Sequence, residues 1–297
     1  MSLSKTNNPL ISVIINCYNG EKFLKKSIES VINQTYSNWE IIFWDNLSND
    51  NSKKIVNHYT DKRIKYFCTK NFTKLYEARN LAIEKASGEF IAFLDVDDWW
   101  TNNKLEIQIN KIKYEKLNVV YSNFYRFYER SKRKKIFATT NLPTGLITQS
   151  LLNLYGVGIL TVLIKKDILK NRKFNKNYEI IGDFDLIIDI SQNLQFGCIQ
   201  EPLAYYRIHS DNLSLKRIEK EKNELEAWIK EKKNELKSYS LDVFDDKIQV
   251  LRIKMDLFSG KRSSAMKKIF SLNNNFRKIK FLISLILPVN LLKILIS

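Results

Sequence analysis

Two aspartates in one short segment have the spacing of a divalent-cation site. Asp95 and Asp97 stand two residues apart, directly after the apolar run at 90–94. In an extended chain, residues two apart point to the same side, so both carboxylates can converge on one ion. Carboxylate oxygens favour Mg²⁺ or Mn²⁺, which usually bridge to substrate phosphates. Taken alone the pattern is weak, because charged residues are common where a strand meets a loop.

A second pair of acids, Asp183 and Asp185, precedes a segment with helical periodicity. A positioned carboxylate can remove a proton from a hydroxyl and so act as a general base. The structural alternative is a helix N-cap, which aspartate also favours. Asp185 is an equal candidate for the cap, which leaves Asp183 available for chemistry.

The elements that would position these acids alternate between strands and helices. Short apolar runs typical of buried strands alternate with stretches of helical periodicity. The strands fall at 10–15, 40–44, 64–67 and 90–94, and the helices at 20–34, 51–59 and 74–86. This alternation predicts a parallel sheet, whose ligands collect at the carboxyl ends of the strands. Because loops 16–20, 45–46 and 95–98 all follow strands, one crevice should receive them.

Beyond residue 117 the regular alternation ends. We predict strands at 119–128, 136–140, 158–164 and 196–208, and a helix at 183–192. Residues 130–135 would form the tip of a hairpin and carry most of its charge. The basic run at 132–135 could hold a phosphate-bearing ligand, although a solvated hairpin tip is the commoner case.

The C-terminal part of the chain is predicted to be helical. Apolar residues recur at helical spacing over 215–237, and more helix should follow through 243–270. The first of these helices could pack on the preceding domain or pair with a second chain in a homodimer. The final segment, 281–296, is apolar, but as a helix it would span only about 24 Å. It therefore suits an interfacial membrane anchor, and the alternative is a C-terminal core helix.

Charge is concentrated near that end of the chain. The 297 residues include 49 Lys or Arg and 32 Asp or Glu, a net charge of +17, with 44% hydrophobic residues. This composition excludes disordered and low-complexity classes. Residues 261–297 carry eight cations and no acid, which favours an anionic bilayer surface over nucleic acid as partner. Three scattered cysteines and a polar N-terminus predict a cytoplasmic protein at the inner face of the membrane.

Four stretches of the chain together resemble the family 2 glycosyltransferases of the GT-A fold. They read ISVIINCYNGEKFLKKSIESVINQTYSNWEIIFWDNLSNDNS, YEARNLAIEKASGEFIAFLDVDDWW, IIGDFDL and LAYYRIHSDNLS, in that order. The resemblance implies an α/β fold with a Rossmann-like mixed sheet flanked by helices, as the catalytic domain over 1–214. The rest, 215–297, would be a helical extension whose basic, apolar tail from about 261 associates with membrane.

The resemblance also implies an activity. It is inverting, metal-dependent transfer from a nucleotide-diphospho-sugar, with a UDP-sugar favoured, to a saccharide or lipid-linked saccharide hydroxyl. In bacteria with the Lys-, Asn- and Ile-rich usage of this sequence, such enzymes often build capsule or lipopolysaccharide. Asp183 matches the family's catalytic base, although Gly182 stands where an acid is often found. Mn²⁺ or Mg²⁺ would offset charge on the leaving diphosphate.

Several further residues match the family's nucleotide-sugar site. Asp45 and Asn46 align with an Asp-Asp pair that holds the nucleoside, and an Asn carbonyl can still accept the N3–H of uracil. Arg79 suits a diphosphate, with a surface salt bridge as its alternative. The complete predicted site is Asn16, Tyr18, Asn19, Glu21, Asp45, Asn46, Arg79, Asp95 and Val96.

Three more residues have two open interpretations each. His209 would complete the metal site with Asp95 and Asp97, or it is a satisfied structural histidine. Trp99 and Trp100 would form a platform for a sugar ring, or pack in the core beneath the acidic loop.

Two other classes of protein are considered beside this family. A non-catalytic binder of nucleic acid or membrane is suggested by the sequence pI of about 9.6, but no nucleic-acid-binding motif is present. A dinucleotide-binding enzyme is disfavoured because the first strand runs into residues 16–20 without Gly-x-Gly-x-x-Gly.

Overall fold

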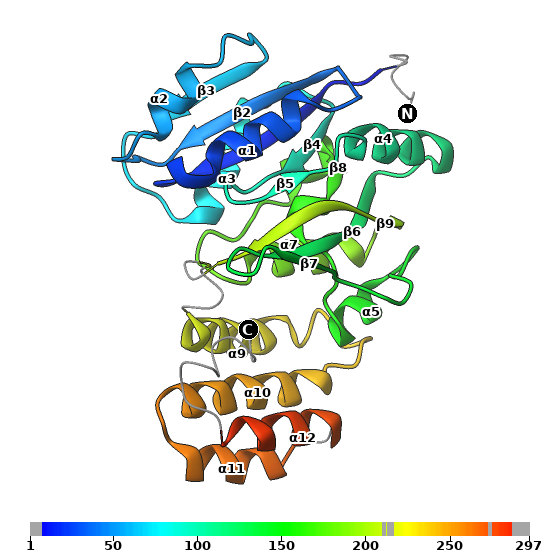
Figure 1. Ribbon diagram of the computed structural model, residues 1–297. Coiled ribbons are helices and arrows are strands. Elements are labelled where there is room, and N and C mark those ends of the chain that lie inside the picture. Colours follow the sequence, from blue (N-terminus) through cyan, green and yellow to red (C-terminus); the bar gives the residue numbers. More distant parts are fainter. Residues whose placement is uncertain (1–7, 210–211, 213–216, 273–274, 287–297) are drawn as a thin grey trace. The chain divides into compact units, whose positions relative to one another are not determined.

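A computed structural model of the chain describes residues 8–209, 212, 217–272 and 275–286 (Figure 1). The chain divides into two compact units, Met1–His209 and Ser210–Ser297, and each is described by itself. The predicted boundary between residues 214 and 215 lies outside the described residues.

Nine strands of the described residues form one mixed sheet in the first unit. Their order is β3-β2-β1-β4-β8-β6-β9-β5, with β7 paired to β6 (Figure 1). The strands are β1 (Ile11–Cys17), β2 (Trp39–Asp45), β3 (Ile64–Cys68), β4 (Phe90–Phe93), β5 (Trp99–Trp100), β6 (Val119–Tyr128), β7 (Arg133–Ile136), β8 (Leu163–Lys165) and β9 (Phe196–Ile208). β1 to β4 are mutually parallel, so the predicted parallel sheet is confirmed for this half.

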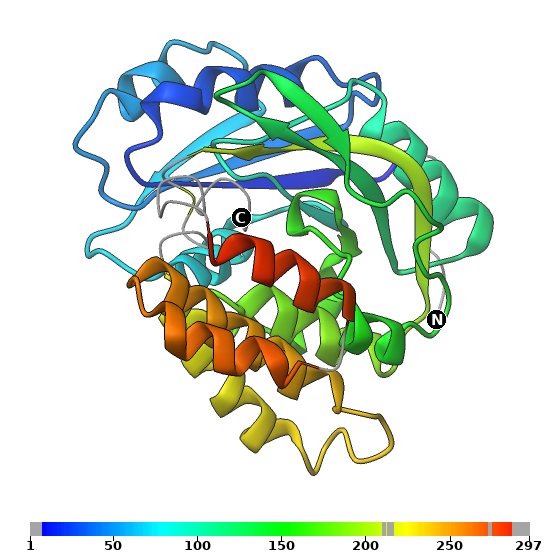
Figure 2. The same cartoon turned by 60° about the horizontal axis from the view of Figure 1, so that its bottom comes forward.

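Helices cover both faces of the parallel half. Those of the first unit are α1 (Glu21–Ile32), α2 (Ser52–Asn57), α3 (Leu75–Lys85), α4 (Lys104–Glu115), α5 (Thr148–Asn153), α6 (Lys166–Asn171) and α7 (Gly182–Ser191). In α1, Leu24, Ile28 and Val31 are fully buried against odd-numbered residues of β1. This pattern is what one apolar helical stripe predicts. α3 packs against β1 and β2 from the other side of the sheet (Figure 2).

The second half of the sheet brings a distant segment to the same edge. β9 runs parallel to β6 for the length of β6, and its last residues are Arg207 and Ile208. Because β9 also pairs with β5, the segment that follows β9 lies beside the acidic loop that precedes β5. His209 therefore comes next to Asp97 although 112 positions separate them.

Three local predictions differ from the structure. The hairpin tip is at 129–132, and Arg133, Lys134 and Lys135 belong to β7 rather than to the turn. The predicted strand at 158–164 is a 3₁₀ turn (Ile159–Thr161) followed by β8. The N-cap of α7 is Ile181, so neither Asp183 nor Asp185 caps the helix; both lie in its first turn, where acids interact favourably with the helix dipole.

The described part of the second unit consists of packed helices (Figure 2). They are α9 (Ile218–Lys232), α10 (Val243–Phe258), α11 (Arg262–Phe270) and α12 (Asn275–Ser284). α10, α11 and α12 share an apolar core that includes Ile253, Ile269 and Phe281. No helix among the described residues is long and apolar enough to cross a bilayer. Most of the predicted anchor lies outside the described residues, because 287–297 are not described.

Candidate active site

The acidic loop at 95–98 is fixed by the end of β9. The backbone N–H of Arg207 donates to Asp98 Oδ1 at 2.8 Å, and its Nε donates to the Asp97 carbonyl at 2.6 Å. His209 Nε2 lies 2.9 Å from Asp97 Oδ2. Asp98 is buried, and burial together with Asp97 and Asp95 raises the pKa of its carboxyl well above the usual value. The acidic loop thus places Asp97 beside His209, whereas Asp98 is a buried residue that joins the loop to β9.

Asp95 has a different partner from Asp97. Arg79 Nη2 donates to Asp95 Oδ1 at 2.7 Å, and the Arg79 side chain is 3% exposed. The guanidinium is therefore buried, whereas the Asp95 side chain is 34% exposed. The described residues contain no group of three or more His, Cys, Asp or Glu side chains that could hold a metal. Of the predicted ligands, the structure therefore brings Asp97 and His209 into contact and holds Asp95 on an arginine.

Asp183 lies at the start of α7 beside the same arginine. Its Oδ1 accepts a hydrogen bond from the Tyr76 hydroxyl at 3.1 Å and from the Phe184 N–H at 3.0 Å. Burial raises the pKa of Asp183, and the positive charge of Arg79 opposes that rise. Because Arg79 interacts with both Asp95 and Asp183, the acidic loop and the predicted base share one buried cation.

Gly182 is required by the way that Tyr76 packs. A Cβ at Gly182 would lie 2.5 Å from ring atoms of Tyr76, which is too close for any larger residue. The Tyr76 hydroxyl is also 2.8 Å from the Ile180 carbonyl, so one phenol contacts both sides of the turn that enters α7. The glycine therefore makes room for a tyrosine that contacts Asp183, the predicted base.

The first loop contributes the predicted residues 16–21. Asn16 is buried at the end of β1, and its Nδ2 has no hydrogen-bond partner within the described structure. Tyr18 is 53% exposed and meets Phe72 edge-on, with ring centroids 5.0 Å apart. Gly20 allows the start of α1 to approach Val96, since a Cβ there would lie 3.0 Å from the valine side chain. The first loop thus brings together the amide of Asn16 and the exposed rings of Tyr18 and Phe72 at the carboxyl ends of the strands.

Asn19 and Glu21 tie the first loop to the loop after β2. Asn19, at a φ of 53°, accepts from the Asn49 N–H through Oδ1. Glu21 Oε2 accepts from the backbone and side-chain amides of Asn51 at 2.8 Å. Nearby, Cys17 is buried, and burial raises the pKa of its thiol. These side chains shape the two loops by binding each other.

Asp45 and Asn46 are both engaged by neighbouring segments. Asp45 accepts from the Tyr66 hydroxyl at 2.6 Å and from the Ser48 N–H at 2.8 Å. The Asn46 amide pairs with Thr73, donating to its carbonyl and accepting from its N–H and hydroxyl. Asn46 thus holds the loop that carries Phe72. Its predicted contact with a base stays a prediction.

The two tryptophans differ in role. Trp100 is 2% exposed, and its Nε1 donates to the Leu160 carbonyl at 2.9 Å, so it belongs to the core as the alternative interpretation held. Trp99 is 8% exposed, stacks on Tyr205 and is covered by Lys26. Neither offers an open face to a sugar.

Sequence reasoning missed three residues that organise the site. Tyr76 contacts Asp183, Tyr66 contacts Asp45, and Arg207 fixes the acidic loop. Arg207 was within reach, because it lies in the stretch LAYYRIHSDNLS two residues before His209. Tyr76 was within reach for the same reason, because it begins the stretch YEARNLAIEKASGEFIAFLDVDDWW. Tyr66 lies outside the four stretches and gave no signal.

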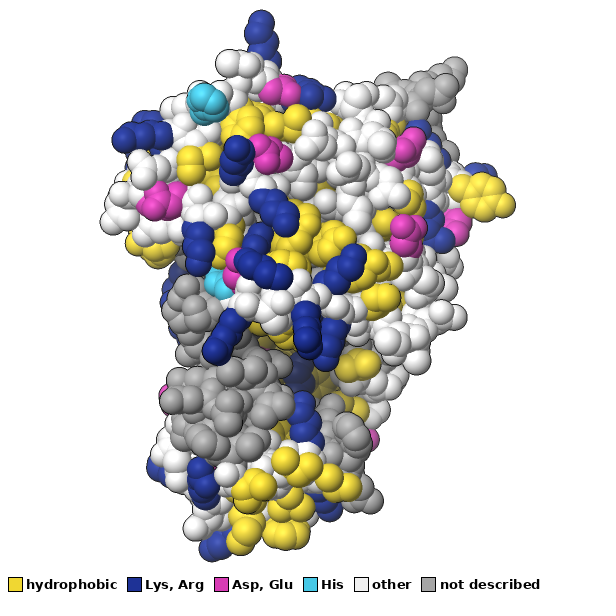
Figure 3. Space-filling view, viewed as in Figure 1, with side chains coloured by type: hydrophobic (Ala, Val, Ile, Leu, Met, Phe, Trp, Pro, Cys, Tyr) yellow, Lys and Arg dark blue, Asp and Glu magenta, His cyan; other side chains and the backbone are white. Residues whose placement is uncertain are grey.

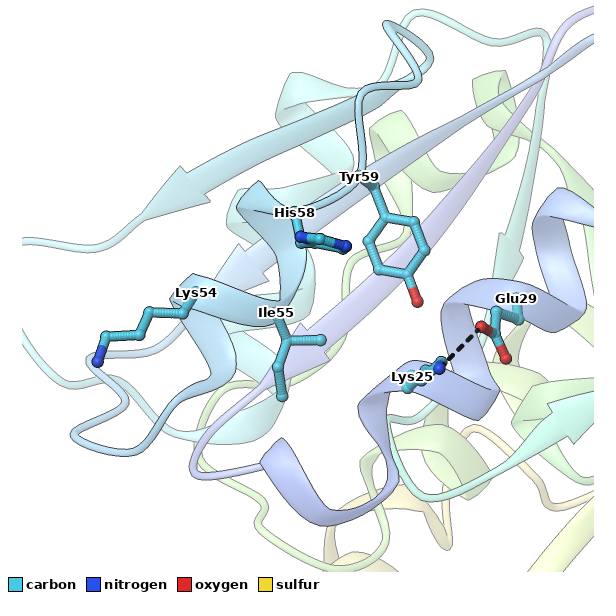
Figure 4. A pocket seen from close by; sticks show the side chains of 6 residues that line it. All are labelled: Lys25, Glu29, Lys54, Ile55, His58 and Tyr59. Carbon is cyan, nitrogen blue, oxygen red and sulfur yellow. Dashed lines mark ion pairs between the residues drawn. The ribbon is translucent and has the colours of Figure 1, made fainter.

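A separate cavity of about 490 Å³ lies between α1 and α2 (Figure 4). Lys25, Glu29, Lys54, Ile55, His58 and Tyr59 line it. None of these belongs to the predicted site, and Lys25 is paired with Glu29. The convergent polar residues therefore lie at the strand ends rather than in this cavity.

Comparison with known proteins gives a consistent assignment. The family model described as glycosyl transferase family 2 matches residues 12–178. The chain is 38% identical over 165 residues to the Escherichia coli protein WfgD, named UDP-Glc:alpha-D-GlcNAc-diphosphoundecaprenol beta-1,3-glucosyltransferase. That match covers 56% of this chain and 64% of WfgD, so the chain spans slightly less than two thirds of that relative.

Solved structures share the fold at low sequence identity. S. aureus TarS 1-349 in complex with UDP has a TM-score of 0.55 and 17% identity, covering 92% of this chain and 69% of TarS. Mannosyltransferase PcManGT from Pyrobaculum calidifontis, in complex with GDP-Man and Mn²⁺, also has a TM-score of 0.55, with 15% identity over 74% of this chain and 63% of its own. At these identities the likeness supports the fold alone.

Proposed function

This chain belongs to glycosyl transferase family 2, and from that premise we propose that it transfers a sugar from a UDP-sugar to a lipid-linked saccharide. It is a glycosyltransferase with the GT-A fold. The donor and acceptor are inferred from WfgD, whose name gives UDP-glucose and a diphosphoundecaprenol-linked GlcNAc. The product would enter a cell-surface glycan such as capsule or lipopolysaccharide.

One structural observation carries the proposal. Arg79 contacts Asp95 of the acidic loop and acts electrostatically on Asp183 of α7, which supports the proposal that the donor-binding loop and the base form one site. Proximity of this kind is a large part of catalysis of two-substrate reactions.

A divalent cation fits the residues present. Asp97 and His209, 2.9 Å apart, supply oxygen and nitrogen donors that Mn²⁺ or Mg²⁺ accepts, and such ions often need only one or two protein ligands beside substrate phosphates. When bound, the ion would neutralise charge on the leaving diphosphate. We propose Asp97 and His209 as its ligands, with Asp95 held by Arg79.

The protein residues then perform one proton transfer. Asp183 accepts the proton of the acceptor hydroxyl while the hydroxyl oxygen of the acceptor forms a bond to the anomeric carbon. The bond from that carbon to the diphosphate oxygen breaks, and the nucleoside diphosphate leaves with the electron pair. Attack from the side opposite the leaving group inverts the anomeric configuration. Burial raises the pKa of Asp183, which makes this carboxylate a better base than an exposed one.

The second unit supports a place at the membrane. Exposed apolar residues on α11 and α12 lie among lysines and arginines, a combination that suits the surface of an anionic bilayer. We propose that the enzyme works at the cytosolic face of the membrane, where a lipid-linked acceptor would be presented.

Thermal unfolding with nucleotides tests the donor and metal. We expect UDP to raise the Tm only with Mn²⁺ present, and GDP, dTDP and CDP to have much less effect. A ligand at a hundredfold excess over its Kd stabilises by about 2.7 kcal/mol. Stabilisation by another nucleotide would reassign the donor, and metal-independent stabilisation by UDP would remove the metal role of Asp97 and His209.

Asp183→Asn tests the base. The variant should still be stabilised by UDP with Mn²⁺ but lose sugar transfer by about a hundredfold or more, in line with general-base catalysis. Asp167→Asn, which changes an exposed aspartate of α6, is the control. Transfer by Asp183→Asn at the control's rate would contradict the assignment.

A further inference from the structure

A row of aromatic rings lies on one face of the sheet beside the proposed donor site. Trp99 stacks on Tyr205 with centroids 4.7 Å apart, and Tyr205 stacks on Tyr125 at 4.9 Å. Phe127 meets Trp99 edge-on at 5.0 Å. The rings come from β5, β9 and β6, whose pairing places them side by side. Because all three strands are held in the sheet, the row is rigid.

Lysines lie over both ends of this row. Lys26 Nζ of α1 is 3.4 Å from the centroid of Trp99. Lys134 Nζ of β7 is 4.4 Å from that of Tyr125. Both lysines are exposed, and the cation–π contacts hold their ammonium groups in place. We call Lys26, Trp99, Tyr125, Phe127, Lys134 and Tyr205 the cation–aromatic face.

Positive charge around this face exceeds the negative charge. Lys26, Lys132 and the Arg207 guanidinium all lie within 6.0 Å of the Phe127 centroid. Glu129 is already paired with both Lys132 and Arg207. Lys26 and Lys134 form no ion pair with any residue that the structure describes. Burial, and then the charge of Arg207, lowers the pKa of Lys26, so an added anion here would relieve repulsion.

The surface view shows the same imbalance. Lys and Arg side chains gather over β6 and β7, with hydrophobic side chains between them and few acids (Figure 3). The basic run that sequence reasoning placed at a hairpin tip is mostly in β7, so Lys134 is held by strand pairing opposite Phe127. A solvated tip would not fix its position in this way.

The face adjoins the donor site through Arg207. This arginine contacts the Phe127 ring and also donates to the Asp97 carbonyl. His209, two residues further on, lies with its ring centroid 5.1 Å from that of Phe23 on α1, three residues before Lys26. A molecule that reaches the anomeric carbon from this side would pass the cation–aromatic face.

We propose that the cation–aromatic face binds the phosphate groups of the acceptor, the diphosphate that joins the saccharide to its lipid. This inference rests on the proposed function, in which the acceptor is a lipid-linked saccharide. The donor diphosphate is already provided for by the divalent cation that we propose at Asp97 and His209. Lys26 and Lys134 supply the ion pairs, and the half-buried rings of Tyr125, Phe127 and Tyr205 supply apolar surface for the first atoms of the lipid.

Acceptor kinetics test the assignment with the full chain. The phosphate-bearing probe is GlcNAc diphosphate esterified to a long alkyl chain, and the phosphate-free probe is the matching alkyl GlcNAc glycoside. In Lys26→Gln/Lys134→Gln the preference for the first probe, as a ratio of kcat/KM values, should fall about fivefold to tenfold. The KM for the nucleotide-sugar should stay unchanged. Lys54→Gln/Lys62→Gln removes the same charge from exposed lysines elsewhere and should leave the preference intact.

Three outcomes would overturn the proposal. A raised KM for the nucleotide-sugar would assign the face to the donor. An equal loss with both acceptor probes would make the lysines structural. Loss of binding to anionic phosphatidylglycerol vesicles, with the acceptor preference retained, would make the face a membrane contact.

A binding measurement separates this proposal from the proposed function. Trp99 lies within the face, so titrating the alkyl diphosphate alone should change tryptophan fluorescence, and Trp99→Phe should remove that change. If the alkyl diphosphate binds saturably and Lys26→Gln/Lys134→Gln weakens that binding, the assignment of the face is supported; a lack of sugar transfer would then count against the proposed function only. If the enzyme is active but its fluorescence does not respond, and if the double variant keeps the acceptor preference, the assignment of the face is overturned and the proposed function stands.

Discussion

Tyr76 and Gly182 are best understood as a pair. Family 2 enzymes often carry an acid where Gly182 stands, and such an acid would need the space that the Tyr76 ring occupies, 2.5 Å from a Cβ at that position. The tyrosine hydroxyl reaches Asp183 instead. In this chain a phenol on α3 therefore contacts the proposed base from a position 107 residues away.

Tyr76→Phe should shift the pH dependence of transfer. A hydrogen bond donated to a carboxylate favours its ionised form, so removing the hydroxyl should raise the pKa of Asp183 further. Because the base must be ionised, activity is lost as pH falls through that pKa, and the acid limb of kcat/KM should move to higher pH. At neutral pH we expect a loss of about threefold to tenfold. Tyr114→Phe, at an exposed position on α4, should leave the profile in place, and an unmoved acid limb in Tyr76→Phe would contradict the role.

At the scale of elements, one buried acid fastens the amino end of the parallel sheet. Glu40 of β2 accepts from Ser12 of β1 at 2.5 Å, from the Ser87 N–H at 2.6 Å and from Lys65 of β3 at 2.6 Å. Burial alone would raise the pKa of Glu40, but these hydrogen bonds outweigh it and hold the pKa below the usual value. The ionised Glu40 carboxylate therefore links β1, β2 and β3 at the end of the sheet opposite the proposed site.

Glu40→Gln should destabilise the protein by about 1 to 3 kcal/mol at pH 7, because the charge-assisted bonds are lost. Since the folded-state pKa lies below the unfolded one, the stabilisation is present at neutral pH and lost as pH falls through the folded pKa. The difference in unfolding free energy between wild type and variant, measured by urea unfolding, should thus stay constant down to about pH 5 and become smaller below it. Glu115→Gln, in an exposed pair with Lys111, should cost less than about 1 kcal/mol. A free-energy difference that grows as the pH falls would show that the ionised form of Glu40 is not the stabilising one.

The parallel half of the sheet could be predicted because its signals are local. Each strand is a short apolar run, and each helix has one apolar stripe, so the loops at the strand ends followed from the alternation. The same reasoning located Asp95 and Asp97, but His209, which lies 2.9 Å from Asp97, was assigned to the metal site only through the resemblance to a family. Without it, nothing in the spacing indicates that β9 runs beside β6.

The antiparallel half was harder to predict for a physical reason. β5 has two residues and β8 has three, so each is defined by pairing with a distant strand rather than by its own pattern. Arg133, Lys134 and Lys135 form part of an exposed edge strand, where the composition resembles that of a turn. Edge strands often carry lysines because charge discourages pairing with another chain. Composition alone therefore could not place these residues in β7.

At the scale of the whole molecule, cations are concentrated in two parts of the chain. The first unit has cations beside the proposed site (Figure 3), whereas residues 261–297 add eight cations without an acid. The described residues of this segment leave apolar side chains exposed on and just after α11 and α12 (Figure 3). Phe270 of α11 is 63% exposed, Ile279 and Ile283 of α12 are 58% and 55% exposed, and Ile286, two residues after α12, is 77% exposed. Exposed apolar surface of this kind usually marks an interaction site.

The spacing of these residues identifies the face of α12 that would meet the bilayer. Ile279 and Ile283 are four residues apart and share one side of the helix, whereas Phe281 is 4% exposed in the helical core. Replacing the two isoleucines should therefore weaken membrane binding without removing core contacts. Ile279→Ser/Ile283→Ser should lower partitioning onto phosphatidylglycerol vesicles in a flotation assay by about tenfold or more, because each buried isoleucine contributes about 1.5 to 3 kcal/mol.

The control for this prediction lies in the other unit. Leu146 and Leu154 are both 72% exposed, so Leu146→Ser/Leu154→Ser removes equivalent apolar surface and should leave flotation unchanged. Binding of the wild type should also fall when vesicles are made of neutral phosphatidylcholine or when salt is raised, since the cations act through screened charges. If the isoleucine variant floats as well as the wild type, α12 does not insert. If the leucine variant alone fails to float, the bilayer contact belongs to the catalytic unit, and the lipid-linked acceptor would be reached from that side.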